Sequence, residues 1–317
     1  MNKKDTRVAA LIRFASAITA LNIAGYLFLG FEQSYATVVT ALLTGYSLEF
    51  LMEFLTAKEQ KRDPKYKGGI KKFLVFLLPP HITSLAVSML TFVNENLILV
   101  VFGVAVAILS KYLFKVNYNS RKRHFLNPSN TGIAVMFLVF PSVGPAPPYQ
   151  FSEALSGIGD WILISVFIIL GSFLNAKFTK KIPLIAAWLF FFFLQAIIRT
   201  TIFGTDTFAA LAVMTGPAFL LFTYYMISDP STTPFKFKNQ IFFGAIVAVV
   251  YAITIELHLV FNLFFSLLIV CIFRGLYMWV YSLRNKEVII PEVNIYPIEM
   301  GVVEARLSNS ELTNATI

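Results

Sequence analysis

Residues 123–141 read RHFLNPSNTGIAVMFLVFP, in which a basic and polar run gives way to about ten apolar residues and then a proline. A transmembrane helix needs about 20 apolar residues, because each residue advances the helix by about 1.5 Å. From Pro128 to Pro141 this segment offers about 21 Å of helix against about 30 Å of hydrocarbon. Its polar start is therefore expected below the membrane surface, against protein or water and not against lipid.

The composition of the chain is that of a membrane protein. Of its 317 residues 57% are hydrophobic and 14% are charged, and the mean hydropathy is +0.72. No soluble domain of this length shows such values, so the sequence predicts an all-α polytopic integral membrane protein. The first apolar run continues past Gly25 without an evident cleavage site, and we interpret it as a membrane span and not as a signal peptide.

Ten apolar windows recur along the sequence, and the fifth is abnormally short. They cover about 9–29, 34–56, 73–92, 95–113, 132–141, 160–176, 182–203, 207–228, 239–256 and 258–282. The sequence therefore predicts about ten transmembrane helices, one of them short or broken.

Lys and Arg gather in alternate connections between these windows. The basic segments are the N-terminus, 57–72, 111–123, 177–181, 235–238 and 284–286. Because cytoplasmic loops carry the excess of Lys and Arg, both termini are predicted inside. Residues 1–284 then form the transmembrane domain and residues 285–317 a cytoplasmic tail. Topology also explains the net charge of +9, so no nucleic-acid partner is expected.

Two polar segments resemble each other, NPSNT at 127–131 and DPSTT at 229–233. Each places an acceptor before a proline and hydroxyl groups after it, at the inside edge of an apolar run. This is the chemistry of a helix N-terminus, which also suits a phosphate or another anion. Simple capping is the alternative. The candidate cofactor-binding residues are Asn127, Ser129, Asn130, Thr131, Asp229, Ser231, Thr232 and Thr233.

Ionisable residues inside apolar runs are candidates for function, because each costs free energy unless it is paired. Glu49 and Glu53 lie one turn apart on one helix face and suggest a cation or proton path, or pairing with Lys58. Arg274 lies deeper, and pairing with an acid, binding of a head group and anchoring of the helix end all stay open. His81 follows two prolines and is expected to be a satisfied structural group, not a metal ligand.

Several blocks of sequence together resemble a known family. They are LGFEQ (29–33), FLLPPHIT (76–83), SKY (110–112), RHFLNPSNTGI (123–133), FPSVGPAPPYQFSE (140–153) and MTGPAFLLFTYYMISDPSTTP (214–234). They resemble the UnbU-like membrane proteins of enediyne biosynthesis loci, which are relatives of the RnfD and NqrB subunits of ion-translocating electron-transport complexes. The resemblance extends over about residues 7–284.

The resemblance implies a ten-span RnfD/NqrB-like fold in the bacterial cytoplasmic (inner) membrane, which holds a flavin and transfers electrons, coupled to cation movement. In RnfD and NqrB the flavin is FMN, attached to the threonine of an S-G-A-T type motif in an outside connection. The equivalent stretch here starts at Ser156 and Gly157, and Gly159 stands at the threonine position. Glycine has no hydroxyl to esterify, so FMN or riboflavin is expected to bind noncovalently.

Three functions follow as hypotheses. The first is a membrane redox subunit with a noncovalent flavin, which exchanges electrons with other redox subunits or quinone. The second is a transporter or channel for a small solute or ion that uses Glu49 and Glu53 and no redox cofactor. The third is a membrane anchor for a neighbouring membrane-associated enzyme.

Overall fold

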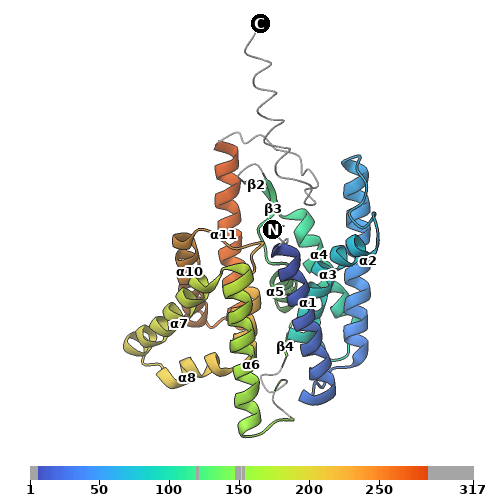
Figure 1. Ribbon diagram of the computed structural model, residues 1–317. Coiled ribbons are helices and arrows are strands. Elements are labelled where there is room, and N and C mark those ends of the chain that lie inside the picture. The colour runs from blue at the N-terminus through green and yellow to red at the C-terminus, as the bar shows by residue number, and fades with distance from the viewer. Residues whose placement is uncertain (1–5, 119–120, 147–150, 152–153, 285–317) are drawn as a thin grey trace.

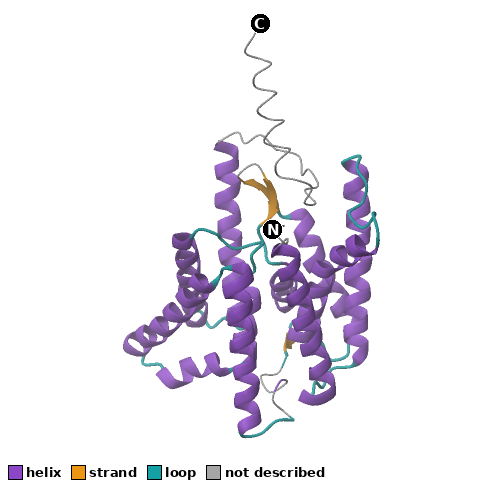
Figure 2. Ribbon diagram, in the orientation of Figure 1, coloured by secondary structure: helices purple, strands orange, loops and turns teal. Residues whose placement is uncertain are grey.

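The computed structural model describes residues 6–118, 121–146, 151 and 154–284, and most of them are helical (Figures 1 and 2). The α-helices are α1 (Thr6–Ala24), α2 (Tyr35–Glu59), α3 (Ile70–Leu90), α4 (Leu97–Leu113), α5 (Pro128–Val139), α6 (Ile158–Leu174), α7 (Ile182–Phe203), α8 (Thr207–Ala212), α9 (Pro217–Leu221), α10 (Phe237–Glu256) and α11 (Asn262–Arg284). The tighter and wider turns are the π-helical η1 (Gly25–Leu29), η3 (Asn175–Thr179) and η5 (Phe222–Met226) and the 3-10 turn η4 (Val213–Thr215). The strands are β1 (Thr91–Phe92), β2 (Lys115–Tyr118), β3 (Arg121–His124) and β4 (Gly144–Pro145). The predicted tail, 285–317, lies outside the described residues.

Seven helices in the described part of the chain are long and apolar enough to cross a membrane. They are Val8–Leu29, Tyr35–Glu59, Ile70–Leu90, Ile158–Thr179, Ile182–Phe203, Phe237–Glu256 and Asn262–Arg284. The structure thus confirms an all-α chain of the membrane type. The other three predicted windows form the shorter α4 and α5 and a broken helix pair, and ten crossings stay a prediction.

The fifth window forms a short helix, as predicted. α5 has 12 residues, with Pro128 at its first position and Asn127 as its cap, whose side chain accepts a hydrogen bond from the Asn130 N–H. Proline is tolerated there because its missing N–H has no partner within the helix in any case.

The eighth window, 207–228, was expected as one span, and the structure shows that it is not one continuous helix. The helix breaks at Gly216, and the two parts, Thr207–Thr215 and Pro217–Met226, are bent by 66°. Pro217 has no N–H to donate back into the preceding turn, and its ring would collide with a carbonyl there, so α9 starts afresh at this residue.

Two helices, one in each half of the chain, end in a π-helical turn that the sequence did not indicate. α1 and α6 each end in a π-helical turn, η1 and η3, followed by a residue in the left-handed region, Gly30 (φ 83°) and Lys180 (φ 55°). The next N–H closes each turn, from Phe31 to the Gly25 carbonyl at 3.0 Å and from Lys181 to the Asn175 carbonyl at 3.1 Å. α1 and α6 thus end by the same wide turn.

Short antiparallel strand pairs lie at both ends of the helix bundle (Figure 1). The β2–β3 hairpin shares the upper end of the molecule in Figure 1 with the end of α2 and the end of α11. The pair formed by β1 and β4 lies at the lower end. The upper end corresponds to the predicted cytoplasmic side, and we refer to the two ends as inside and outside on that basis.

Candidate functional site

Glu53 on α2 is buried and held by the loop that follows the same helix. Its two carboxylate oxygens accept from the Arg62 guanidinium at 2.5 and 3.2 Å, and the Lys65 backbone N–H donates to it at 2.7 Å. The loop therefore folds back over the inside end of α2 and neutralises this carboxylate.

Glu49 lies one turn deeper and pairs with α4. Lys111 Nζ is 2.5 Å from one carboxylate oxygen, and the Tyr112 hydroxyl donates to the other at 3.1 Å. Lys58, the partner that the pairing alternative named, makes neither contact. Arg62 and Lys111 take its place, one from a loop and the other from another helix.

His81 on α3 joins two neighbouring helices through hydroxyl groups. Its Nε2 is 2.7 Å from Thr19 Oγ on α1, and its Nδ1 is 2.6 Å from the Tyr46 hydroxyl on α2. Since Thr19 donates its own proton to the Ala15 carbonyl at 2.7 Å, we assign Nε2–H as the donor to Thr19 and Tyr46 as the donor to Nδ1. His81 is thus a satisfied group, as expected, and one with a second proton-binding nitrogen.

These residues belong to two polar helix faces that meet at the Tyr46–His81 hydrogen bond, and we call them together the polar ladder. Its members are Tyr46, Glu49 and Glu53 on α2, His81, Ser84 and Ser88 on α3, and Thr91 directly after α3. Spacings of three and four place each set on one side of its helix. At 1.5 Å per residue the two parts cover about 25 Å, most of the hydrocarbon thickness.

The outer half of the polar ladder contains buried oxygens that no described group satisfies. Ser84 Oγ has no hydrogen-bond partner, and neither has Asn22 Oδ1, on α1 one turn beyond Thr19. The Asn22 amide nitrogen donates to the Ile18 carbonyl at 2.9 Å and to Met89 Sδ at 3.6 Å. Because an unpaired buried oxygen costs free energy, these two positions are suited to bound water.

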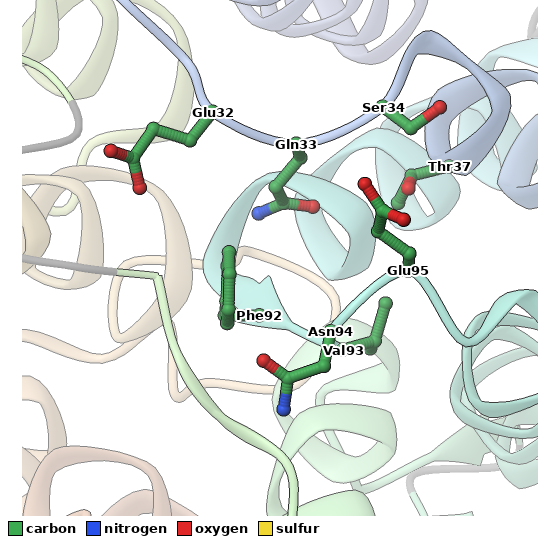
Figure 3. Close-up of a pocket in the computed structure, with 8 residues that line it drawn as sticks. All are labelled: Glu32, Gln33, Ser34, Thr37, Phe92, Val93, Asn94 and Glu95. Carbon is green, nitrogen blue, oxygen red and sulfur yellow. The ribbon is translucent and has the colours of Figure 1, made fainter.

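A small hollow closes the outside end of the polar ladder (Figure 3). Its volume is about 60 Å³, and its lining is Glu32, Gln33, Ser34, Thr37, Phe92, Val93, Asn94 and Glu95. Gln33 donates to the carbonyl of Thr91, the last ladder residue, at 2.8 Å. In Figure 3 the Glu95 carboxylate lies beside Thr37, whereas Glu32 points away from it. The hollow has room for a few waters and offers an acidic mouth.

The sequence indicated Glu49 and Glu53 as candidates and His81 as a structural group, but it did not bring them together with the other ladder residues. A signal was present, because positions 81, 84, 88 and 91 repeat at helical spacing within an apolar span. Tyr46 and Thr19 gave no such signal, since only the packing of α1, α2 and α3 brings them to His81.

The two predicted cofactor segments lie side by side. The Asn127 amide donates to the Met226 carbonyl at 3.1 Å, just before Asp229, and the Asn130 amide donates to the Phe264 carbonyl on α11 at 3.0 Å. Most of their polar groups are used within the protein, and the exception is the buried Asn130 side-chain oxygen, which has no hydrogen-bond partner among the described residues. Ser129 donates to the Asn127 side chain at 3.0 Å, and Thr131 donates to the Asn127 carbonyl at 2.7 Å.

The DPSTT segment is a turn and does not start a helix, so the expectation of a second helix N-terminus was wrong. The Asp229 carboxylate accepts from the hydroxyls of Ser231 and Thr232, all at 2.7 Å, and its carbonyl accepts from Thr233. The next helix, α10, begins only at Phe237. The aspartate therefore closes its own turn, and no row of free helical amides follows it.

Three basic residues surround this turn. Lys181 is fully buried and donates to the Pro234 carbonyl at 2.7 Å, Arg274 donates to the Thr232 carbonyl, and Arg123 lies over the Phe235 ring at 5.4 Å. Burial lowers the pKa of Lys181 to about 8, against a partial opposing effect of Asp229. The deep Arg274 thus pairs with a carbonyl in the described structure.

The buried Lys181 predicts a specific dependence of stability on pH. Between its folded pKa of about 8 and its ordinary value of 10.5, the unfolded chain binds more protons than the folded chain, so stability rises with pH in this window. Between pH 8 and 10.5 we expect the free energy of unfolding of the wild type to rise by about 1–3 kcal/mol more than that of Lys181→Met. Thermal unfolding in detergent at several pH values provides the measurement. The neighbouring, exposed Lys180→Met is the control and should retain the gain; equal pH profiles for all three proteins would contradict this assignment.

Comparisons with known proteins give no family for this chain. No protein-family model matches it, and no curated protein matches it. The UnbU-like and RnfD/NqrB resemblance therefore stays a prediction.

The flavin that the resemblance implies does not fit the predicted residues as they stand. Ser156 and Gly157 precede α6, whereas Lys181 and the DPSTT turn lie beyond its other end, about 25 Å away along the helix. At the start of α5 the Asn130 N–H is capped by the Asn127 side chain and the Thr131 N–H donates to the Asn127 carbonyl. The hollow of about 60 Å³ is far below the roughly 300 Å³ of a ligand pocket, and a second hollow, of about 390 Å³, has none of these residues in its lining.

A spectroscopic prediction follows from this poor fit. We expect the protein, purified in mild detergent, to lack a stoichiometric flavin band in its visible absorption spectrum. Supplementing the growth medium with riboflavin is the control against loss through limited supply. A flavin released by acid at about one per chain would contradict the prediction and restore the redox hypothesis.

Proposed function

We propose that this chain is a multi-pass membrane protein that moves protons along the polar ladder. The observation that carries the proposal is His81, held between Thr19 and Tyr46 at 2.7 and 2.6 Å in the middle of an apolar span. Histidine is the side chain whose charge changes most readily near neutral pH, and ionisable groups at such depth mark proton relays in membrane proteins.

The chemistry required of each group is modest. A proton accepted at one imidazole nitrogen of His81 is released from the other, and rotation of the two flanking hydroxyls resets the chain. Outward, the unsatisfied oxygens of Ser84 and Asn22 supply places for water. Inward, one helical turn separates Tyr46 from Glu49, a gap that a single water molecule bridges.

The paired carboxylates give the inside half a fixed charge pattern. Glu49 pairs with Lys111 and Glu53 pairs with Arg62, so the inside half of the polar ladder offers carboxylate oxygens that each lie against a neighbouring cation. This supports the second hypothesis from the sequence, with His81 and not the two carboxylates as the centre of the path.

The proposal also bears on the redox hypothesis. Cation movement is one half of what the resemblance implies, and it is the half that described side chains support. Partner redox subunits, quinone and a bacterial inner-membrane location remain proposals from the resemblance alone.

The direct test is proton flux into liposomes that contain the purified protein. A potassium diffusion potential drives the movement, and a pH-sensitive dye inside the vesicles reports it. We expect the vesicle interior to acidify faster than in protein-free liposomes. The rate should stay the same when sodium replaces choline in the outside buffer, because the proposed path carries protons and not sodium. Flux equal to that of protein-free liposomes, with a correctly folded protein, would overturn the proposal.

A further inference from the structure

A groove runs between α7 and α10, which lie side by side at the edge of the bundle (Figure 1). Its volume is about 390 Å³, the size of a small-molecule site. Its lining is Gln195, Ile198, Arg199, Phe203, Val249, Ala252, Ile253, Glu256 and Leu257. These residues lie toward the outside end of both helices, far from the polar ladder in sequence and on other helices.

The rim of the groove faces hydrocarbon. Ile198, Val249 and Ile253 are 45%, 51% and 52% exposed, and Phe203 and Leu257 are more exposed still. In a chain of this type, apolar side chains that remain so exposed are covered by lipid. The groove therefore opens sideways into the bilayer.

The side-chain amide of Gln195 is buried in the groove without hydrogen-bond partners among the described residues. Its side chain is buried, with 6% exposed, and neither its amide oxygen nor its amide nitrogen has a hydrogen-bond partner among the described residues. A buried amide without partners is costly, and more so where no water is at hand. A ligand in the groove that accepts a hydrogen bond from the amide nitrogen removes the part of this cost that belongs to that nitrogen.

One turn further out, Arg199 and Glu256 present both signs of charge. Arg199 Nε is 2.5 Å from a Glu256 carboxylate oxygen. The two terminal amino groups of the guanidinium make no hydrogen bond to a described residue, and neither does the second oxygen of Glu256. The Glu256 side chain, on the last residue of α10, is 29% exposed and accessible to a head group.

We propose that the groove binds a glycerophospholipid whose head group carries a phosphate and a primary ammonium, as phosphatidylethanolamine does. The phosphate accepts from the amino groups of Arg199, and the ammonium donates to Glu256. Gln195 lies four residues, about 6 Å, deeper and donates to an ester carbonyl of the glycerol. The acyl chains then follow Ile198 and Val249 along the apolar rim.

The charges favour this head group over other lipids. An anionic head group without an ammonium places a second negative charge beside Glu256. A choline head group has no N–H to donate to the carboxylate. Only a lipid with both a phosphate and an N–H donor satisfies Arg199 and Glu256 together.

The test is lipid-dependent stability of the delipidated protein in detergent. Phosphatidylethanolamine, phosphatidylcholine and phosphatidylglycerol with identical acyl chains are added, and thermal unfolding and bound mass by native mass spectrometry are recorded. We expect one bound lipid and a clear rise in the midpoint for phosphatidylethanolamine, with about tenfold weaker apparent binding for the other two. Equal effects of all three lipids would overturn the head-group assignment.

Two variants locate the effect in the groove. Gln195→Leu removes the unpaired amide, so the lipid-free protein should be at least as stable as wild type, yet bind the lipid about tenfold more weakly. The double substitution Arg199→Glu with Glu256→Arg keeps an ion pair but reverses it, and should abolish the preference. Unchanged lipid binding in both variants would overturn the site. A second result would also overturn it, namely that the protein is a dimer, that Gln195→Leu disrupts this dimer, and that lipid has no effect on stability.

Discussion

Replacing His81 with Phe is expected to reduce proton flux in liposomes by a factor of a hundred or more, because the flanking Thr19 and Tyr46 hydroxyls then have no group between them that exchanges a proton. Phenylalanine has a ring of similar shape, so the packing of α1, α2 and α3 is largely kept. The flux assay with the potassium diffusion potential provides the measurement.

His258 supplies a matched control for this substitution. It is exposed, in the turn between α10 and α11, so His258→Phe should leave the flux unchanged. His81→Gln adds a second comparison, because glutamine restores hydrogen bonds without restoring the exchange and should be as inactive as phenylalanine. Full flux in both His81 variants would place the path elsewhere, whatever their stability.

The second large effect concerns Glu49. Glu49→Gln leaves the Lys111 ammonium buried without its carboxylate, 2.5 Å away in the wild type, and should cost about 3–5 kcal/mol of stability. Adding Lys111→Met removes the stranded charge and should recover most of that stability, measured as the thermal midpoint in detergent. Flux should stay low in the double variant, because the carboxylate that stabilises the passing proton is absent.

The exposed residues Lys58 and Glu59 at the end of α2 provide a control for the loss of an acidic and a basic side chain as such. Glu59→Gln with Lys58→Met removes the same two charge types and should alter neither stability nor flux appreciably. A double variant at Glu49 and Lys111 with wild-type flux would show that this pair is structural only, and would restrict the proposed path to His81 and its hydroxyl partners.

Much of the architecture was predictable because the membrane imposes simple rules. Apolar windows and alternating basic loops indicated where helices run, and Asn127 before Pro128 indicated where α5 starts. The break at Gly216 was missed, although Gly-Pro is a strong breaker, because the apolar window continues through it. The wide turns η1 and η3 leave no recognisable pattern in the sequence.

The candidate site was less predictable, because its partners come from distant segments. Glu53 is paired by a loop that folds back, and Glu49 by a lysine 62 residues away, which helical spacing does not indicate. Asp229 looked like a helix cap, but its carboxylate bonds to the hydroxyls of its own turn. Local propensity cannot distinguish these two uses of the same residues, since both satisfy the turn equally well.

The hydrogen bonds of α5 also constrain how the protein is made. This helix is synthesised early, yet Asn127 finds its acceptor at Met226, and Asn130 finds its acceptor at Phe264, 134 residues later. Until α11 has left the ribosome and entered the bilayer, the amide of Asn130 has no carbonyl to bind. The contacts that hold α5 in place are therefore complete only after the last described helix has been made, although α5 comes fifth in the chain.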